Sequence, residues 1–224
     1  MTDGTPNTPG KDTASAKDTP KSQRTRARIL DCAMRLFADI GYAAATNARI
    51  AEEARLTRGA MLYHFPSRET LVEAAVEHID AARSALLTAA ASNPPPGADL
   101  AEHAIDVYWS LLRAPPFLAF SELEAVARTD TLVRERIAVA QTAFDQTLAG
   151  DQLLRMVQAG AGPRFQASRD LARFMLEGLS RAKLTYDDQA RVENLLMVIK
   201  RATHMLNRKG GIQDLWPEEQ SARS

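Results

Sequence analysis

Two short helical segments joined by three residues constrain the fold of this chain more than any other feature. Residues 47–54 and 58–65 each carry apolar side chains at helical spacing, and each follows a threonine, Thr46 or Thr57. Threonine is a favoured N-cap because its hydroxyl accepts a hydrogen bond from a backbone N–H of the first turn. The linking residues 55–57 leave room only for a tight turn. This pattern predicts a helix-turn-helix, whose second helix fits the major groove of DNA.

The second of these helices is the candidate recognition helix. Its polar and small residues are expected to meet base edges and phosphates, namely Arg58, Gly59, Ala60, Tyr63 and His64. The residues expected to face the core are Ile50, Ala51 and Ala54 in the first helix and Met61, Leu62 and Phe65 in the second. The alternative for Tyr63 and His64 is partial burial as packing residues, and for Arg58 it is a solvated surface charge.

Charge also favours the N-terminal part as the region that meets a polyanion. Residues 21–70 hold nine Lys or Arg against five Asp or Glu, whereas residues 71–224 hold seventeen against twenty, although the net charge is zero. The basic run Lys21, Arg24, Arg26 and Arg28 is either a solvated helix start or an arm that touches DNA. Thr46 and Thr57 act as caps alone or as caps that also contact phosphate, because helix N-termini attract anions.

Helical periodicity continues on both sides of this unit, and no segment alternates as a strand does. Residues 22–40 form an amphipathic helix that Gly41 ends, and Ser67 caps a long helix that stops at the prolines of residues 94–96. Further helices are predicted at 99–114, at 117–128, from about 130 to before Gly160, at 168–183 and at 187–208. The predicted fold class is therefore all-α, with about nine helices.

The N-terminal residues resemble a known family. Residues 28–42 read Arg-Ile-Leu-Asp-Cys-Ala-Met-Arg-Leu-Phe-Ala-Asp-Ile-Gly-Tyr, followed by Thr46, by Ile-Ala-Glu-Glu-Ala at 50–54 and by Thr-Arg-Gly-Ala-Met-Leu-Tyr-His-Phe-Pro-Ser-Arg-Glu at 57–69. This stretch is similar to the N-terminal domain of the TetR/AcrR family of transcriptional regulators. Arg58 and Arg68 stand where the family has lysines, so Arg68 joins the predicted DNA contacts, with a solvated surface charge as its alternative. Ala60 lacks the usual hydroxyl and offers bases only an apolar contact, and Leu62 replaces the usual tyrosine.

The resemblance implies a division of the chain into two functional parts. Residues 1–20 are predicted to be a disordered tail, because they hold no large apolar residue after Met1. A three-helix helix-turn-helix DNA-binding domain is expected over 21–67, a larger helical effector-binding and dimerisation domain over 68–209, and a C-terminal tail over 210–224.

In such regulators the middle helices enclose a pocket for a small-molecule effector. Most of the large aromatic residues of this chain lie there, together with a few polar groups that can orient a ligand. The predicted ligand-binding residues are Tyr108, Trp109, Phe117, Phe120, Ser121, Glu122 and Phe144. The alternative for each aromatic residue is that it only fills the core.

The last two helices are expected to form the interface of a homodimer. In the family two helices from each subunit pack into a four-helix interface, and a symmetric operator requires a symmetric protein. The predicted interface residues are Leu171, Phe174, Met175, Leu179, Val192, Leu195, Leu196 and Ile199. The same apolar stripe is equally compatible with a core inside one chain.

No catalytic residue, metal site or cofactor is predicted. The four histidines stand far apart without Cys, Asp or Glu at ligand spacing, and the lone Cys32 is expected to be a packed thiol. No apolar run is long enough to span a bilayer, so a cytoplasmic protein without a membrane partner is expected. The expected function is a transcriptional regulator, with repression as the family expectation, that binds a palindromic operator in double-stranded DNA and responds to a small-molecule effector. The alternatives are an all-helical protein-interaction module without DNA binding and, last, an enzyme.

Overall fold

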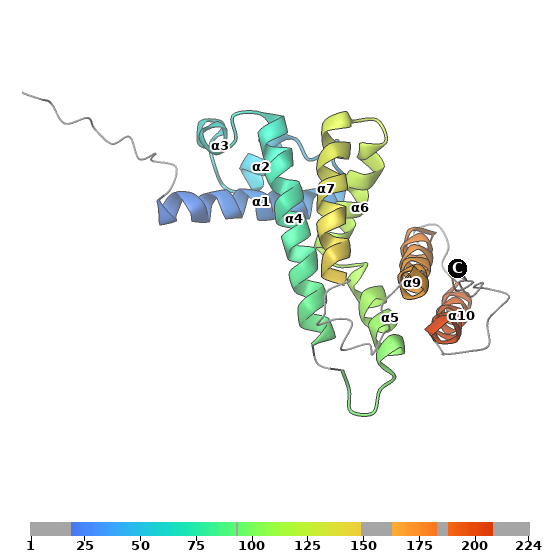
Figure 1. Ribbon diagram of the computed structural model, residues 1–224. Helices are drawn as coiled ribbons and strands as arrows, with labels where there is room; N and C mark the ends of the chain where they lie inside the picture. Colours follow the sequence, from blue (N-terminus) through green and yellow to red (C-terminus); the bar gives the residue numbers. More distant parts are fainter. Residues whose placement is uncertain (1–18, 93, 149–162, 183–187, 208–224) are drawn as a thin grey trace, which may run out of the picture.

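The computed structural model describes residues 19–92, 94–148, 163–182 and 188–207 (Figure 1). Over these ranges the chain forms nine helices and no strand, so the predicted all-α class is confirmed. The helices are α1 (Pro20–Ile40), α2 (Asn47–Glu53), α3 (Arg58–His64), α4 (Arg68–Ala91), α5 (Leu100–Leu111), α6 (Pro115–Ala127), α7 (Thr131–Leu148), α9 (Pro163–Ala182) and α10 (Gln189–Asn207).

The predicted caps set the helix starts around the helix-turn-helix. The Thr46 hydroxyl accepts a hydrogen bond from the Arg49 N–H at 3.3 Å, and the Thr57 hydroxyl accepts one from the Ala60 N–H at 3.2 Å. Ser67 caps α4 in a reciprocal arrangement with Thr70. These bonds satisfy N–H groups that have no partner inside their own helix, which fixes where each helix begins.

Three predicted helix starts are wrong. Helix α1 begins at Pro20 with Thr19 as its cap, so residues 19 and 20 belong to the helix and not to the predicted tail. Helix α6 begins at Pro115 and not at residue 117, and helix α9 begins at Pro163 and not near residue 168. In all three cases a proline opens the helix, a position where its missing N–H costs nothing. Residues 1–18 and 210–224 of the predicted tails lie outside the described residues. So does the end of the helix that is predicted from about residue 130 to before Gly160.

One apolar core joins the three N-terminal helices to α4, α6 and α7. Its fully buried side chains include Phe37, Ile50, Met61, Phe65, Leu71, Ile79 and Leu123. Helix α6 packs against α1, α4 and α7, and Figure 1 shows it beside α7. The core therefore continues across residue 67, where the sequence predicts a domain boundary.

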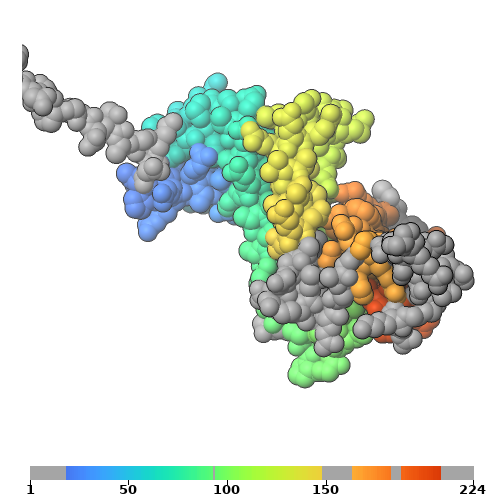
Figure 2. Space-filling view, viewed as in Figure 1, coloured from blue at the N-terminus to red at the C-terminus, as the bar shows by residue number. Residues whose placement is uncertain are grey.

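A second apolar core lies near the C-terminal half of α4. It gathers Leu87 of α4 with residues of α5, α6, α7, α9 and α10, including Ile105, Phe117, Phe144, Leu176 and Ile199. Helices α9 and α10 pack on each other and on α5, at the opposite end of the molecule from α1–α3 (Figures 1 and 2). Helix α4 contributes to both cores and runs from the helix-turn-helix to the outer helices.

The turn between α2 and α3 holds an arginine in an unusual backbone conformation. Arg55 has φ of 53°, and it is the only non-glycine residue with positive φ in the described ranges. The Arg55 N–H donates to the Glu52 carbonyl at 2.9 Å, and the Leu56 N–H donates to the Ala51 carbonyl at 2.8 Å. This pair of bonds is the Schellman motif, which places a left-handed residue directly after a helix and usually employs glycine there.

We expect Arg55→Gly to raise the free energy of unfolding by about 0.5–1 kcal/mol, measured by urea denaturation. The left-handed conformation costs a residue with a Cβ about 1–2 kcal/mol, and the added freedom of glycine in the unfolded chain offsets about 0.4–1 kcal/mol of that relief. Arg55→Ala is the control, because it removes the same exposed side chain and keeps the strain. Equal stability of the Gly and Ala variants would contradict this account.

Candidate functional site

The recognition helix α3 presents its predicted polar face to solvent. Arg58 and Gly59 are exposed, Tyr63 is 47% exposed, and a Cβ at Gly59 would meet nothing within 4 Å. Met61 and Phe65 are fully buried, as predicted. Helix α3 therefore offers an uncovered surface on which a nucleic-acid backbone can approach closely.

Leu62 is not buried, so its predicted inward orientation is wrong. Its side chain is 40% exposed and lies on the same short helix as Tyr63. Met61 and Phe65, one turn apart, already fill the contact between α3 and the core, and residue 62 points away from that stripe. An exposed leucine at this position gives the recognition helix an apolar group suited to a thymine methyl.

Arg26 anchors the C-terminal end of α3. Its guanidinium donates to the His64 carbonyl at 3.2 Å and lies 4.3 Å from the centroid of the Phe65 ring. Burial and, secondarily, the charge of Arg26 lower the pKa of His64, so its imidazole is neutral at physiological pH. Sequence reasoning treated Arg26 only as part of a basic run, because its carbonyl partner lies 38 residues away along the chain.

Arg68 anchors the segment that leads into α2. Its guanidinium donates to the Ala45 carbonyl at 2.7 Å, to the Tyr42 carbonyl at 3.0 Å and to the Asn47 side chain at 3.3 Å. The same group lies 4.5 Å from the centroid of the Tyr42 ring. These bonds tie the start of α4 to the start of α2, so Arg68 is a positioning residue. Phosphate contacts by Arg68 and by the exposed Arg24 stay predictions.

Helix α6 makes a direct polar contact with the end of α1. The Tyr42 N–H donates to Glu122 Oε1 at 3.0 Å, and the same oxygen lies 3.0 Å from where a Cβ on Gly41 would stand. Gly41 has φ of 81°, so the chain turns there in a conformation that suits glycine. This contact joins the middle helices to the DNA-binding unit.

A groove of about 840 Å³ opens beside this contact. Helices α1, α6 and α9 and the end of α5 line it with apolar side chains, including Phe37, Leu112 and Leu118. Its polar lining residues are Arg113, Ser121, Glu122, Glu124, Glu177, Ser180 and Arg181. Arg181 crosses from α9 to α6, where it donates to Glu124 at 2.6 Å and to the Ser121 hydroxyl at 3.1 Å.

The structure separates the predicted ligand-binding residues into two groups. Ser121 and Glu122 line the groove. The aromatic residues Tyr108, Phe117, Phe120 and Phe144 are buried, and Trp109 packs at the edge of the second core. The three phenylalanine rings lie around the guanidinium of Arg83, at 5.3, 3.6 and 4.0 Å from it respectively. Sequence reasoning missed Arg83 because its helical position alone does not distinguish it from a surface arginine.

Helices α9 and α10 leave an apolar face uncovered by the described part of the chain. Its residues are Leu171, Phe174 and Met175 on α9 and Leu195, Val198 and Met205 on α10. Val192 and Ile199 are fully buried within the chain and Leu196 packs against the second core, so these three are misplaced as interface residues. They lie on the inner face of α10, whereas Leu179 is half-buried.

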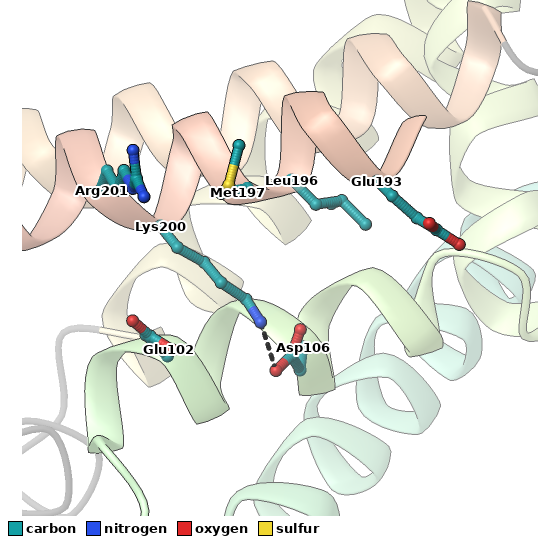
Figure 3. Close-up of a pocket in the computed structure, with 7 residues that line it drawn as sticks. All are labelled: Glu102, Asp106, Glu193, Leu196, Met197, Lys200 and Arg201. Atoms are coloured by element: carbon teal, nitrogen blue, oxygen red, sulfur yellow. Dashed lines mark hydrogen bonds and ion pairs between the residues drawn. The ribbon is translucent and has the colours of Figure 1, made fainter. Parts of the chain in front are cut away.

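The inner side of α10 is held to α5 by an ion pair. Lys200 Nζ lies 2.7 Å from Asp106 Oδ2 across a hollow of about 350 Å³ (Figure 3). Glu102 and Asp106 of α5 line this hollow together with residues of α10, and Figure 3 shows Lys200 reaching from α10 to Asp106. Since the pair is one-quarter to one-half exposed, it contributes little stability and chiefly fixes the register of the two helices.

The described residues hold neither a cluster of metal ligands nor a membrane-spanning helix. No group of three His, Cys, Asp or Glu side chains there is arranged to hold a metal ion. None of the helices in these ranges is long and apolar enough to cross a membrane. Cys32 is buried, and burial raises the pKa of its thiol.

The geometry of α1–α3 defines a helix-turn-helix unit set on a larger helical body. The family model described as "Bacterial regulatory proteins, tetR family" matches residues 29–75, which span this unit. Over these residues the chain is similar to that family. It is 42% identical over 59 residues to the HTH-type transcriptional regulator TtgR of Pseudomonas putida, a match that covers 26% of this chain and 28% of TtgR.

Similarity to solved structures extends over most of the fold. A TetR-family transcriptional regulator from Cytophaga hutchinsonii aligns with a TM-score of 0.68 at 17% identity, covering 87% of this chain and 100% of that one. A putative regulator from Saccharomonospora viridis, solved with choline, aligns with a TM-score of 0.61 at 19% identity, covering 80% and 95%. At sequence identities of 17% and 19%, the similarity shows a shared fold only.

We expect Arg68→Met to lower the free energy of unfolding by about 2–3 kcal/mol, because it removes the partner of two backbone carbonyls. Arg58→Met, at an exposed position on α3, should change it by no more than about 0.5 kcal/mol. Urea denaturation followed by circular dichroism measures both. If the two variants were equally stable, Arg68 would not position α2.

Proposed function

We propose that this protein is a DNA-binding transcriptional regulator that binds a palindromic operator as a homodimer and is modulated by a small-molecule effector. The main support for this proposal is the solvent-exposed face of α3. Two arginines hold the unit in place. Arg26 of α1 bonds to the end of α3, and Arg68 of α4 bonds to the segment before α2. A recognition helix fixed in this way loses little conformational entropy when it binds base edges. Repression is the mode of regulation that the family resemblance favours.

A second copy of the chain is the proposed occupant of the outer face of α9 and α10. One recognition helix covers only one half-site, and two half-sites about 34–36 Å apart, or a multiple of this, require a two-fold symmetric partner. The exposed side chains of this face are large and apolar, with Phe174 58% exposed. An apolar face on two packed helices matches the composition of homodimer interfaces. It lies away from α1–α3, so both recognition helices stay free (Figure 1).

Coupling between effector and DNA is proposed to pass through α6. Helix α6 lines the groove and accepts the Tyr42 N–H through Glu122. A molecule held against α6 and α9 therefore acts on the end of α1, whose orientation sets the position of the recognition helix. Binding a ligand in this class of fold has a precedent in the similar regulator solved with choline. By linkage, an effector that weakens DNA binding is itself bound less tightly by the DNA complex.

We expect Arg58→Ala and Tyr63→Ala each to weaken binding to a DNA fragment from upstream of the protein's own gene by about 1–3 kcal/mol. Fluorescence anisotropy at several salt concentrations measures this affinity. If Arg58 contacts a phosphate, its loss also reduces the slope of log affinity against log salt by about one.

The matched control is Arg136→Ala, which removes an exposed arginine of α7 that pairs with Glu73. It should leave DNA affinity and salt slope unchanged. Unaltered affinity in both recognition-helix variants would count against the proposal. Salt-insensitive capture of a protein partner, without DNA binding, would favour a helical interaction module instead.

We expect Phe174→Glu to convert the dimer to a monomer, because burying a charge without a partner at an apolar interface is strongly unfavourable. Sedimentation equilibrium measures the oligomeric state. Val139→Glu is the control, since Val139 of α7 is 70% exposed and lies outside this face. A wild-type chain that sediments as a monomer at micromolar concentration would overturn the dimer.

A further inference from the structure

The exposed face of the recognition helix α3 has a middle that lacks polar side-chain atoms. Four of the seven residues of α3 are exposed, namely Arg58, Gly59, Leu62 and Tyr63. At about 100° per residue, Leu62 and Gly59 are neighbours on the helix surface and lie between the two polar side chains. Met61 and Phe65 lie outside this exposed arc and are fully buried.

Hydrogen bonding by side chains on this face is confined to its two edges. Arg58 carries a guanidinium and Tyr63 a hydroxyl, whereas Leu62 has only apolar atoms. The Tyr63 ring packs edge-on against the His64 ring, with 5.2 Å between their centroids, and this contact holds it at its edge of the face. Leu62 is 40% exposed and belongs to neither apolar core of the described residues. Its apolar surface therefore contributes to neither core and is open to a partner.

Gly59 leaves bare backbone beside Leu62. Its φ is not positive, so other residues can adopt the same conformation, and a Cβ there would meet nothing within 4 Å. Glycine inside a helix is less favourable than alanine. Neither the backbone conformation nor the packing of the described residues requires glycine at this position. What it provides is a flat surface on which a partner can come close to Leu62.

Base edges in the major groove differ in how they meet an apolar side chain. Thymine presents a 5-methyl group there, whereas the other three bases present only hydrogen-bond donors or acceptors. Contact between a methyl group and leucine is favourable, because it removes the apolar surface of both from water. A donor or acceptor covered by leucine loses its water and gains no hydrogen bond, which is unfavourable. The middle of the exposed face of α3 therefore favours thymine.

We infer that Leu62 is a specificity-determining residue that reads the 5-methyl group of a thymine in each half-site of the operator. Gly59 allows the close approach that this contact needs, and Arg58 and Tyr63 supply polar contacts on either side. A half-site read in this way holds a T·A pair opposite the middle of α3. The inference rests on the proposed function, since it assigns the chemistry by which the proposed regulator selects its operator.

Removing the methyl groups from DNA tests the inference on the full-length protein. The protein first selects its preferred sequence from a randomised library of double-stranded DNA. The selected fragment is then made with dTTP or with dUTP, which removes each thymine methyl and keeps the hydrogen-bonding atoms. We expect uracil to weaken binding about fourfold for each half-site, the value of one buried methyl group, measured by fluorescence anisotropy. Equal affinity for the two fragments would overturn the inference.

Variants at residue 62 assign the methyl contact to a side chain. Leu62→Ala shortens an exposed side chain, so the fold should persist and the two fragments should bind within about twofold of each other. Leu62→Met keeps an apolar side chain of similar size and should keep the preference for thymine. Val139→Ala, on α7 and 70% exposed, is the matched control and should also keep it. An unchanged preference in Leu62→Ala would place the contact elsewhere, or trace it to a change in DNA shape, and overturn the inference.

One base pair separates thymine from methylated cytosine, which carries the same methyl group. The T·A pair whose change to uracil costs the most affinity is replaced by C·G or by 5-methyl-C·G. We expect 5-methylcytosine to bind about fourfold more tightly than cytosine, and no more tightly than thymine. Equal binding of the two cytosines would mean that the methyl group is not read. Tighter binding of 5-methylcytosine than of thymine would overturn the choice of thymine.

The selection step separates this inference from the proposed function. A selected sequence that binds without any preference for the methyl group would reject the role of Leu62 and leave the regulator. A library from which no sequence is enriched would reject the proposed regulator itself, and this inference with it.

Discussion

The continuous apolar core between the helix-turn-helix and the rest of the chain is the constraint on which this structure depends. Three helices of about 45 residues bury little surface among themselves and would be marginally stable alone. Helix α4 extends their core through Leu71 and Ile79, and α6 completes it with Phe120 and Leu123. The recognition helix is therefore held by the same side chains that hold the middle helices together. The packing of α6 is therefore part of the core that positions α3.

Arginines beside aromatic rings occur in two different settings in this fold. The guanidinium groups of Arg26 and Arg68 each contact an aromatic ring and donate to backbone carbonyl oxygens. These contacts hold the helix-turn-helix unit together. Arg83 has rings around it but no carbonyl or carboxylate within hydrogen-bond reach among the described residues. The first two are therefore satisfied, whereas Arg83 keeps two buried donors, Nε and Nη1, without an acceptor among the described residues. Arg58, by contrast, is exposed on α3 and free to meet phosphate.

Helix α6 makes polar contacts with both the helix-turn-helix unit and the outer helix α9. On one side Glu122 accepts the Tyr42 N–H at the end of α1. On the other side Ser121 and Glu124 accept hydrogen bonds from Arg181 of α9, the helix that carries half of the proposed dimer face. Three neighbouring residues of one helix thus join the DNA-binding unit to the outer helices. These contacts are polar and partly exposed, so they break and re-form at a lower cost than the apolar core beside them.

The sequence by itself determined the elements of this protein, and the tertiary structure decided which way they face. Thr46, Thr57 and Ser67 fix helix starts through bonds to residues three positions away, and prolines open or end helices, so such boundaries follow from local chemistry. The helix-turn-helix and the all-α class were predictable for that reason. The limits of the inward face of α3 and the inward face of α10 were not, because periodicity defines a stripe without saying what covers it. Leu62 proved exposed, and Val192 and Ile199 proved buried, once the neighbouring helices were in place. The roles of Arg26, Arg68 and Arg83 likewise depend on partners distant in the sequence, which only the packed fold brings within hydrogen-bond or ring-contact distance.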